Sequence, residues 1–174
     1  VRFGQMVSML NVQVDSSAFR GLAVRNTHVT VNALGRKVTA SGNLALGDMR
    51  AALGGEVDGA GEELPAFHVD GDVSSLDFEH ILHDSTYSSD ITMKLNATGT
   101  GLTWNTLNGT LALDLTSSRF RDYNVTQGDV ELTIDQKDPA NKRLQFDSNI
   151  ADLTLTGSFD LGYLMALIPY EITK

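Results

Sequence analysis

Large apolar side chains alternate with mostly polar ones along most of this chain, most regularly between residues 107 and 135. In this segment they stand at every second position: Leu111, Leu113, Leu115, Val130, Leu132 and Ile134. A period of two places successive side chains on opposite faces of a β-strand. The stretch between the two runs holds turn-favouring residues: Ser117, Ser118, Asp122 and Asn124. The pattern therefore predicts two amphipathic strands joined by a polar connection at residues 116–124.

The same alternation recurs before and after this segment and predicts an all-β chain. Further strands are expected over residues 10–14, 29–33, 38–46, 49–57, 67–73, 91–97, 144–146 and 153–159. Turn-forming residues separate them at 16–21, 34–35, 47–48, 58–63, 99–101 and 136–142. The pattern thus predicts strand after strand, joined by short polar connections.

Two segments break the strand rhythm and have the spacing of short helices. Residues 74–83 carry three apolar residues at helical spacing: Phe78, Ile81 and Leu82. Ser75 is the expected N-cap of this helix. In residues 160–169, Asp160 is the expected cap and Pro169 the expected end. Helices of this length can cover the open end of a sheet whose apolar face is otherwise bare.

Short matching segments indicate an internal repeat. They occur in the same order: residues 16–20 match 117–121, and residues 38–46 match 153–161. The first pair is separated by 101 positions and the second by 115, so the later copy would hold 14 more residues. We expect one domain over residues 1–174 with repeat copies at about 8–46 and 107–161, which stack to extend one surface.

Length, composition and net charge limit which classes of protein and of binding partner are plausible. The 174 residues suffice for one sizeable domain, and 41% hydrophobic with 20% charged residues is typical of globular chains. The net charge of -9 disfavours nucleic acid and an anionic membrane surface as partners. Without cysteine, disulfides and cysteine-ligated metals are excluded. No apolar run approaches the roughly 20 residues of a membrane-spanning helix. Because the sequence opens at Val1 in mid-pattern, we expect a segment of a longer protein.

A series of small-residue and apolar motifs follows in the second part of the chain. They are the strand end and helix at 73–82, the small-residue turn at 97–102, Leu107-Asn108-Gly109 with the alternating leucines to Leu115, Phe120–Tyr123 and residues 155–161. This series resembles the AsmA and TamB group of bacterial envelope proteins, most closely a TamB-type translocation and assembly module. The resemblance covers roughly residues 65 to 170 well and the first part more loosely.

That resemblance implies a long periplasmic protein of a Gram-negative bacterium, anchored in the inner membrane by a helix outside this sequence. Its body would be a curved antiparallel, repeat-like β-sheet with two short helices that forms an apolar groove, an arrangement called a β-taco. The family is similar to bridge-like lipid-transfer proteins and is implicated in moving phospholipid toward the outer membrane. The TamB branch is also linked to assembly of outer-membrane β-barrel proteins, which makes such a barrel a further expected partner.

The expected function depends on what the apolar face of the sheet contacts. If the sheet curls, this face becomes a trough for phospholipid acyl chains, but if it packs on a second sheet it becomes the closed core of a β-sandwich. The first alternative predicts non-enzymatic lipid carriage along this groove lining: Val29, Val31, Ile91, Met93, Leu95, Leu111, Leu113, Leu115, Val130, Leu132, Ile134, Leu144, Phe146, Leu153, Leu155 and Phe159. The rival function is an assembly scaffold whose strand edges bind nascent β-barrel proteins by strand addition.

Other constellations give weaker signals. Glu79, His80 and His83 lie close together on the expected helix, but the spacing lacks a third metal ligand, so we expect solvated side chains. Asp70 and Asp72 are expected as outward carboxylates on a half-exposed strand, and the serine pairs as turn and cap residues. We therefore expect no catalytic residue, no metal, no cofactor and no enzyme activity.

Overall fold

One ten-stranded antiparallel sheet makes up most of the molecule. The computed structural model describes residues 7–19, 21–149 and 151–164. The strands are β1 (Val7–Phe19), β2 (Leu22–Leu34), β3 (Lys37–Leu46), β4 (Met49–Asp58), β5 (Ala66–Leu76), β6 (Ser89–Thr100), β7 (Asn108–Phe120), β8 (Tyr123–Asp135), β9 (Lys142–Ser148) and β10 (Asp152–Gly157). Between β5 and β6 lie the helix α1 (Phe78–Leu82) and the 3₁₀ turn η1 (Ser85–Tyr87).

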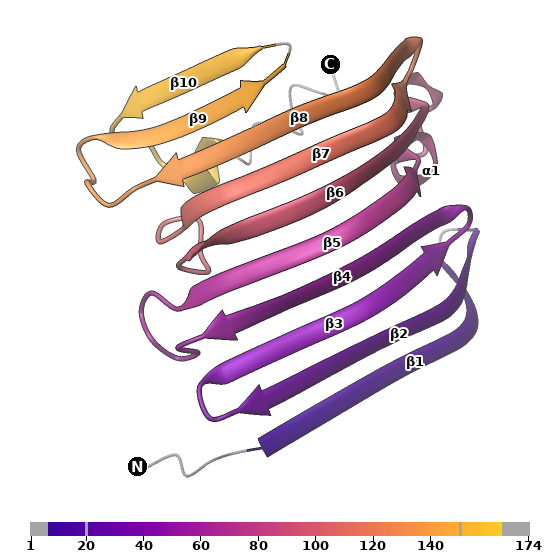
Figure 1. The fold of residues 1–174 in the computed structure, drawn as a ribbon, viewed down its shortest axis with the longest axis horizontal. Helices are drawn as coiled ribbons and strands as arrows, with labels where there is room; N and C mark the ends of the chain where they lie inside the picture. The colour runs from indigo at the N-terminus through magenta and orange to yellow at the C-terminus, as the bar shows by residue number, and fades with distance from the viewer. Residues whose placement is uncertain (1–6, 20, 150, 165–174) are drawn as a thin grey trace.

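The strands lie in the sheet in the order of the sequence, with β1 and β10 at its two edges (Figure 1). The sheet is twisted and curved, and it stays open. This confirms the predicted all-β open sheet. Within the described residues all ten strands belong to this single sheet, so the alternative of a closed β-sandwich is wrong.

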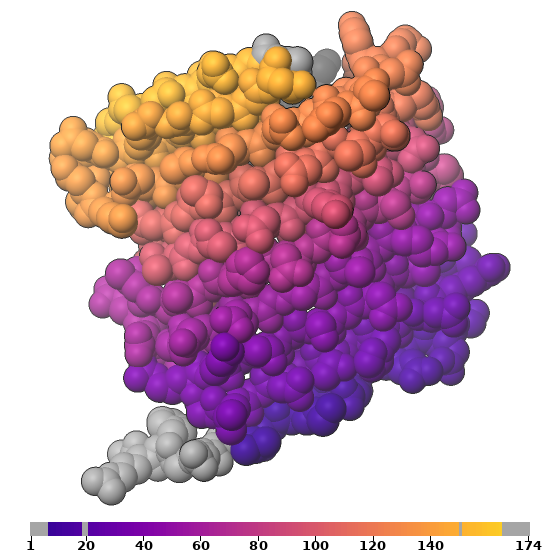
Figure 2. Space-filling view, in the orientation of Figure 1, coloured from indigo at the N-terminus to yellow at the C-terminus, as the bar shows by residue number. Residues whose placement is uncertain are grey.

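The alternation of apolar and polar residues along each strand gives the sheet two chemically distinct faces, because residues paired across an antiparallel ladder lie on the same face. Leu113 in β7 pairs with Leu95 in β6 and with Val130 in β8. The next residue, Asp114, pairs with Lys94 and points to the other side. The strands thus cross one broad surface, which Figure 2 shows as successive bands from indigo at β1 to yellow at β10.

Three non-glycine residues with a left-handed backbone mark kinks in the strands. Asn26 in β2, Ser75 in β5 and Ser117 in β7 have φ angles of 47°, 53° and 47°. Near each of them the register with a neighbouring strand shifts by one residue. Bulges of this kind increase local twist and bend a strand. The sheet therefore curves at these points while its pairing continues on both sides.

The predicted helix over residues 74–83 is wrong in its start and its cap. β5 continues to Leu76, so helical structure begins only after that residue. Asp77 is the N-cap, and its side chain accepts the N–H of Glu79 at 2.9 Å. Ser75, the expected cap, instead occupies the left-handed kink near the end of β5.

The second predicted helix begins as expected. Residues 161–164 are helical, and Asp160 caps them through its Oδ1, which accepts the N–H of Tyr163 at 2.9 Å. The carbonyl of Asp160 also accepts the N–H of Leu164 at 3.1 Å. The expected end at Pro169 lies outside the described residues.

The polar connections predicted at 16–21 and 116–124 are much shorter in the structure. β1 continues to Phe19, and only two residues separate β7 from β8. Turn-favouring residues therefore lie inside these strands, where a side chain can hydrogen-bond to backbone groups beside a kink. The Oγ of Ser118 accepts the N–H of Thr92 and donates to the carbonyl of Thr92, both at 3.0 Å.

Of the two pairs of repeated segments, the first occupies equivalent positions in the sheet and the second does not. The hairpins β1–β2 and β7–β8 have the same register at a shift of 101 residues: Val12 pairs with Val29 and Leu10 with Val31, as Leu113 pairs with Val130 and Leu111 with Leu132. The second pair of segments differs in position. Residues 38–46 belong to β3, beside β2, whereas residues 153–157 belong to β10, which β9 separates from β8.

A hydrophobic core is almost absent from the described part of the chain. The buried hydrophobic residues there are Ala51, Val73 and Leu161. The accessible surface is 11783 Å², whereas a compact monomer of this mass exposes only about 8,300 Å². The single-layer sheet therefore leaves a large part of its apolar side chains in contact with solvent.

Candidate functional site

Apolar side chains form continuous rows that cross the sheet on one side, which we call the apolar face. One row consists of Val12, Val29, Gly42, Leu53, Gly71, Leu95, Leu113 and Val130. The next consists of Leu10, Val31, Ala40, Gly55, Val69, Ala97, Leu111, Leu132, Phe146 and Leu153. Adjacent strands lie about 4.8 Å apart, so a row across the whole sheet is on the order of 45 Å long.

Over β2–β6 the apolar face contains a groove with a volume of about 670 Å³. Large side chains make much of its lining: Val29, Leu44, Leu53, Val69, Val73 and Leu95. Between them lie Ala40, Gly42 and Gly55, which we call the small-residue floor. Pockets that hold small organic ligands typically have volumes of about 300–1,000 Å³. The groove is therefore large enough to hold part of an apolar molecule.

Close approach of the neighbouring strand keeps two floor residues small. A Cβ on Gly55 would lie 2.9 Å from the carbonyl oxygen of His68 and 3.2 Å from Cγ2 of Val69. A Cβ on Gly42 would lie 2.7 Å from the carbonyl oxygen of His28. A side chain at either position would displace backbone, so the fold itself maintains the floor.

The residues predicted as groove lining occupy positions on the apolar face, apart from Phe159. Phe159 follows β10, and the Nζ of Lys142 lies 5.9 Å from the centroid of its ring. Three of the predicted residues line the groove over β2–β6: Val29, Met93 and Leu95. Most of the others lie on β7–β10. Those on β7–β9 are half-buried, whereas Leu153 of β10 has 65% of its surface accessible.

The sequence-based list missed most of the groove lining on β3–β5: Val38, Leu44, Leu53, Val57, Val69 and Val73. These residues do stand at every second position, but Gly42, Gly55 and Gly71 also occupy apolar-face positions of the same strands and make the hydrophobic pattern weaker. Glycines at the apolar positions of successive strands are themselves a signal, because they mark places where strands approach closely or leave space.

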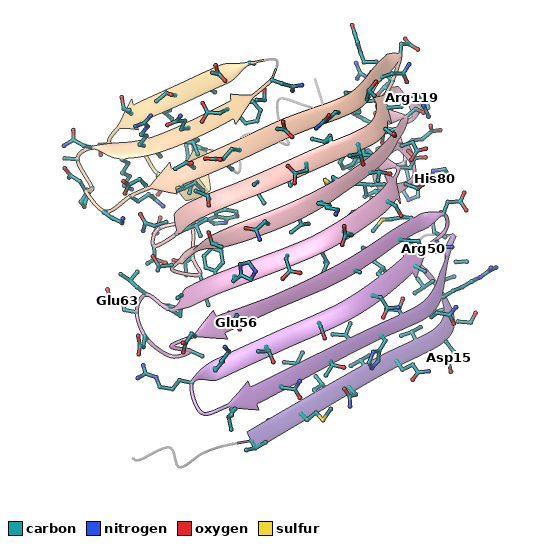
Figure 3. All side chains as sticks on the ribbon, viewed as in Figure 1. Asp15, Arg50, Glu56, Glu63, His80 and Arg119 are labelled. Carbon is teal, nitrogen blue, oxygen red and sulfur yellow. The ribbon has the colours of Figure 1, made fainter. Side chains whose placement is uncertain are left out.

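Ionisable side chains gather on the opposite, polar face, on which Figure 3 labels Arg50 and Glu56 of β4. The Nζ of Lys37 lies 2.8 Å from Oε2 of Glu56, and the hydrogen bond to Glu56 raises the pKa of Lys37 above its ordinary value. His68 and Asp70 approach to 3.4 Å on the same face. All four side chains are well exposed, so this face is a solvated surface.

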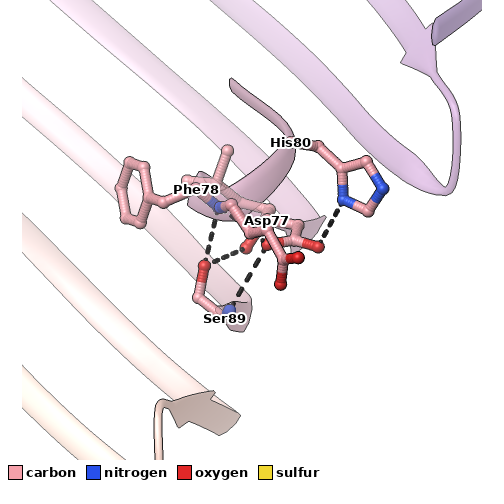
Figure 4. A network of polar contacts seen from close by, with 6 residues as sticks. Asp77, Phe78, His80 and Ser89 are labelled. Carbon is pink, nitrogen blue, oxygen red and sulfur yellow. Dashed lines mark hydrogen bonds and ion pairs between the residues drawn. The ribbon is translucent and has the colours of Figure 1, made fainter. Parts of the chain in front are cut away.

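His80 belongs to a network that fixes α1 to β6 (Figure 4). Its Nδ1 donates to Oδ2 of Asp77 at 2.6 Å, and the N–H of Ser89 donates to Oδ1 of Asp77 at 3.3 Å. The Oγ of Ser89 accepts the N–H of Phe78 at 2.7 Å. Burial alone raises the pKa of Asp77, but the hydrogen bonds from His80, Glu79 and Ser89 outweigh it and hold this pKa below its ordinary value. The described residues contain no group of three or more His, Asp or Glu placed to hold a metal ion.

A second anchored structure lies at the opposite strand ends from α1, where β6 turns into β7. The Nε2 of Gln136 donates to the carbonyls of Trp104 and Leu107 at 2.9 and 2.8 Å. The helical turn after β10 packs against this connection, because a Cβ on Gly162 would lie 3.4 Å from the Cβ of Trp104. Leu161 of the same turn is fully buried. Sequence reasoning did not single out Gln136, since nothing local distinguishes it from a loop residue.

Comparison of the chain with protein-family models, curated proteins and solved structures finds no match. Across the described ranges, no helix is long and apolar enough to span a membrane. The apolar face holds no ionisable side chain at its positions on β2–β6, so this region offers an apolar surface for burial.

Proposed function

We propose that the apolar face binds the acyl chains of phospholipids and lets them move along it without any chemical step. One observation carries the proposal: the apolar rows continue across the sheet, and in the described residues no second layer covers them. Soluble monomers rarely expose contiguous apolar patches beyond a few hundred Å² unless an apolar partner meets them. A lipid chain is such a partner.

Hydrocarbon suits this face better than a polar ligand does. Each methylene group moved from water onto an apolar surface gains about 0.8 kcal/mol, and it requires no directional contact. Because the rows repeat at every strand, a chain can shift by one strand and meet similar surroundings. The sequence resemblance to TamB-type proteins supports the same proposal, in which the chain is a non-enzymatic periplasmic segment that carries phospholipid between the inner and outer membranes.

Strand addition at the edge of the sheet is the second candidate function. β1 is 13 residues long, and its outer edge pairs with none of the described residues. A long edge with free N–H and C=O groups can accept an extended peptide. In that case the partner is an unfolded segment of an outer-membrane β-barrel protein, and the groove stays empty.

The proposal is tested by native mass spectrometry of the purified chain, with lipid extraction of the same sample. We expect phospholipid to accompany the wild-type chain. We expect it to be lost from the double variant Leu53→Asp with Leu113→Asp, which places one carboxylate in each half of the apolar face. Burying a carboxylate against hydrocarbon is strongly unfavourable, and both sites are partly exposed, so the variant should still fold.

The matched control is Asn32→Asp with Thr110→Asp, which adds the same charges on the polar faces of β2 and β7. Both control positions are exposed and pair with neutral neighbours. The control should retain lipid at the wild-type level. Lipid-free wild-type protein, or equal retention by both double variants when circular dichroism shows them folded, would overturn the proposal.

A further inference from the structure

The apolar face differs in depth along its length, and the depth follows residue size within the rows. Over β3 and β4 two adjacent rows contain the small-residue floor (Ala40, Gly42 and Gly55). Over β7 and β8 the same two rows contain large side chains: Leu111, Leu113, Val130 and Leu132. Correspondingly, the groove of about 670 Å³ is lined by residues of β2–β6 and by none of β7–β10.

Large residues border the floor on both sides along the rows. Val29 on β2 pairs with Gly42, and Val69 on β5 pairs with Gly55. Leu53 lies between them on β4 and also lines the groove. A chain lying on the floor therefore meets apolar side chains at its flanks as well as below it, whereas a chain on β7–β8 meets the tops of leucines and valines. The gain from burial is proportional to the apolar area removed from water, so the floor holds a chain more tightly.

We infer that the groove over β2–β6 is the resting site of a single acyl chain, and that Ala40 determines how bulky a chain it accepts. The inference rests on the proposed function and adds a location to it. The chain is held over the small-residue floor, and it passes over β7–β9 without being held there. Ala40 is the one floor residue that already carries a Cβ, and it is exposed, so it can be enlarged without the backbone clash that a Cβ would meet at Gly42 and Gly55.

The properties of the groove select hydrocarbon as the occupant. The apolar-face positions of β2–β6 carry no ionisable side chain, and the carboxylate of Glu56, which belongs to the groove lining, pairs with Lys37 on the polar face. A charged or strongly polar occupant would therefore lose its hydration without compensation. The charged groups of these strands, including Arg50 and Asp72, lie on the polar face. The neutral part of a lipid matches the groove, and its polar end stays in solvent.

Photolabelling of the wild-type chain locates the occupant without any mutation. The probe is palmitic acid that carries a photoreactive diazirine near the end of its chain. After irradiation, digestion and mass spectrometry, we expect on the order of tenfold more label in peptides from residues 38–57 than in peptides from residues 111–132. A tenfold ratio corresponds to the additional burial of about two methylene groups.

Enlargement of the floor gives a second, independent measurement with the same probe. Ala40→Leu should weaken probe binding on the order of tenfold, because the new side chain displaces about two methylene groups, and Ala40→Phe should weaken it further. The matched control is Ala52→Leu, an exposed alanine on the polar face of β4, which should bind like wild type.

The outcomes separate this inference from the proposed function. Equal labelling of both regions, or tighter binding by Ala40→Leu, would overturn the resting site while leaving lipid binding in place. Absence of label everywhere, together with lipid-free purified protein, would overturn the proposed function itself. Label concentrated in residues 38–57 and lost from Ala40→Leu supports both.

Discussion

Single polar side chains hold the irregular parts of this sheet together. Ser118 bonds to both backbone groups of Thr92 beside the kink at Ser117. Asp77 joins α1 to the start of β6 through His80 and the backbone of Ser89. With so little hydrophobic core in the described residues, such bonds contribute a larger share of local order than they do in a compact domain. Single substitutions of these residues should therefore lower the free energy of unfolding.

We expect Asp77→Asn to reduce the free energy of unfolding by about 1 kcal/mol at pH 7, because asparagine still caps α1 but loses its charge-assisted bond to His80. The pKa of Asp77 is lowered in the folded state, so its stabilisation is present above the ordinary aspartate pKa and is lost as the pH falls through the lowered value. Urea unfolding at several pH values should show the difference between variant and wild type shrinking below about pH 4. A gap that stays constant down to pH 3 would contradict this account.

The connection between β6 and β7 is anchored by residues from distant parts of the sequence. Gln136 is buried and satisfies two carbonyls of that connection, while Asn108 accepts the N–H of Gln136 at 2.6 Å. The helical turn after β10 then packs on Trp104. Residues far apart in the sequence thus form one unit at this end of the strands.

Gln136→Ala should release this unit, because it leaves two carbonyls without their donor, at a cost of about 1–3 kcal/mol. Trp104 is the chain's single tryptophan, so its fluorescence reports directly on the connection. We expect its emission to shift to longer wavelength and its quenching by acrylamide to increase. Gln127→Ala, at an exposed position of β8, is the control and should leave the spectrum unchanged. An unchanged spectrum in both variants would show that the two hydrogen bonds do not hold the connection.

Across the described residues, the molecule is a single curved layer with two edges, and the edges differ. β10 is six residues long, whereas β1 is 13 and exposes apolar side chains on both sides, including Met9 and Leu10. Long, flat, apolar edge strands favour pairing between chains, and natural edges carry lysine to prevent it. The described part of β1 has no lysine. The edge is therefore the surface at which copies of this chain should associate.

Met9→Lys should lower self-association several-fold, because the charge would have to be buried or repelled in an edge-to-edge pair. Analytical ultracentrifugation over a range of protein concentrations measures the effect. Thr39→Lys places the same charge in the same cross-strand row but on the interior strand β3, and it should leave association as in the wild type. If both variants associate equally, the contact between copies does not involve β1.

Alternation in the sequence was sufficient to predict the strands and their faces. It could not distinguish an open sheet from a sandwich, because Leu111, Leu113 and Leu115 alternate in the same way whether their face meets a second sheet, a ligand or water. The kinks at Asn26 and Ser117 were not predicted either, because asparagine and serine are equally typical of an ordinary turn. The part of the groove lining on β3–β5 was missed for a similar reason. The depth of the groove there comes from residues such as Gly55, which do not appear as hydrophobic positions in the sequence pattern.

The sequential order of the strands has a consequence for how the chain folds and changes length. Nearly all pairing is between neighbours in the sequence, so loop-closure costs are small, and folding can begin at any hairpin and spread outward. The same locality makes length an adjustable property. Insertion or removal of one hairpin would alter the span of the sheet by about 10 Å and disturb only the two strands at the junction. The number of hairpins therefore sets the length of such a sheet.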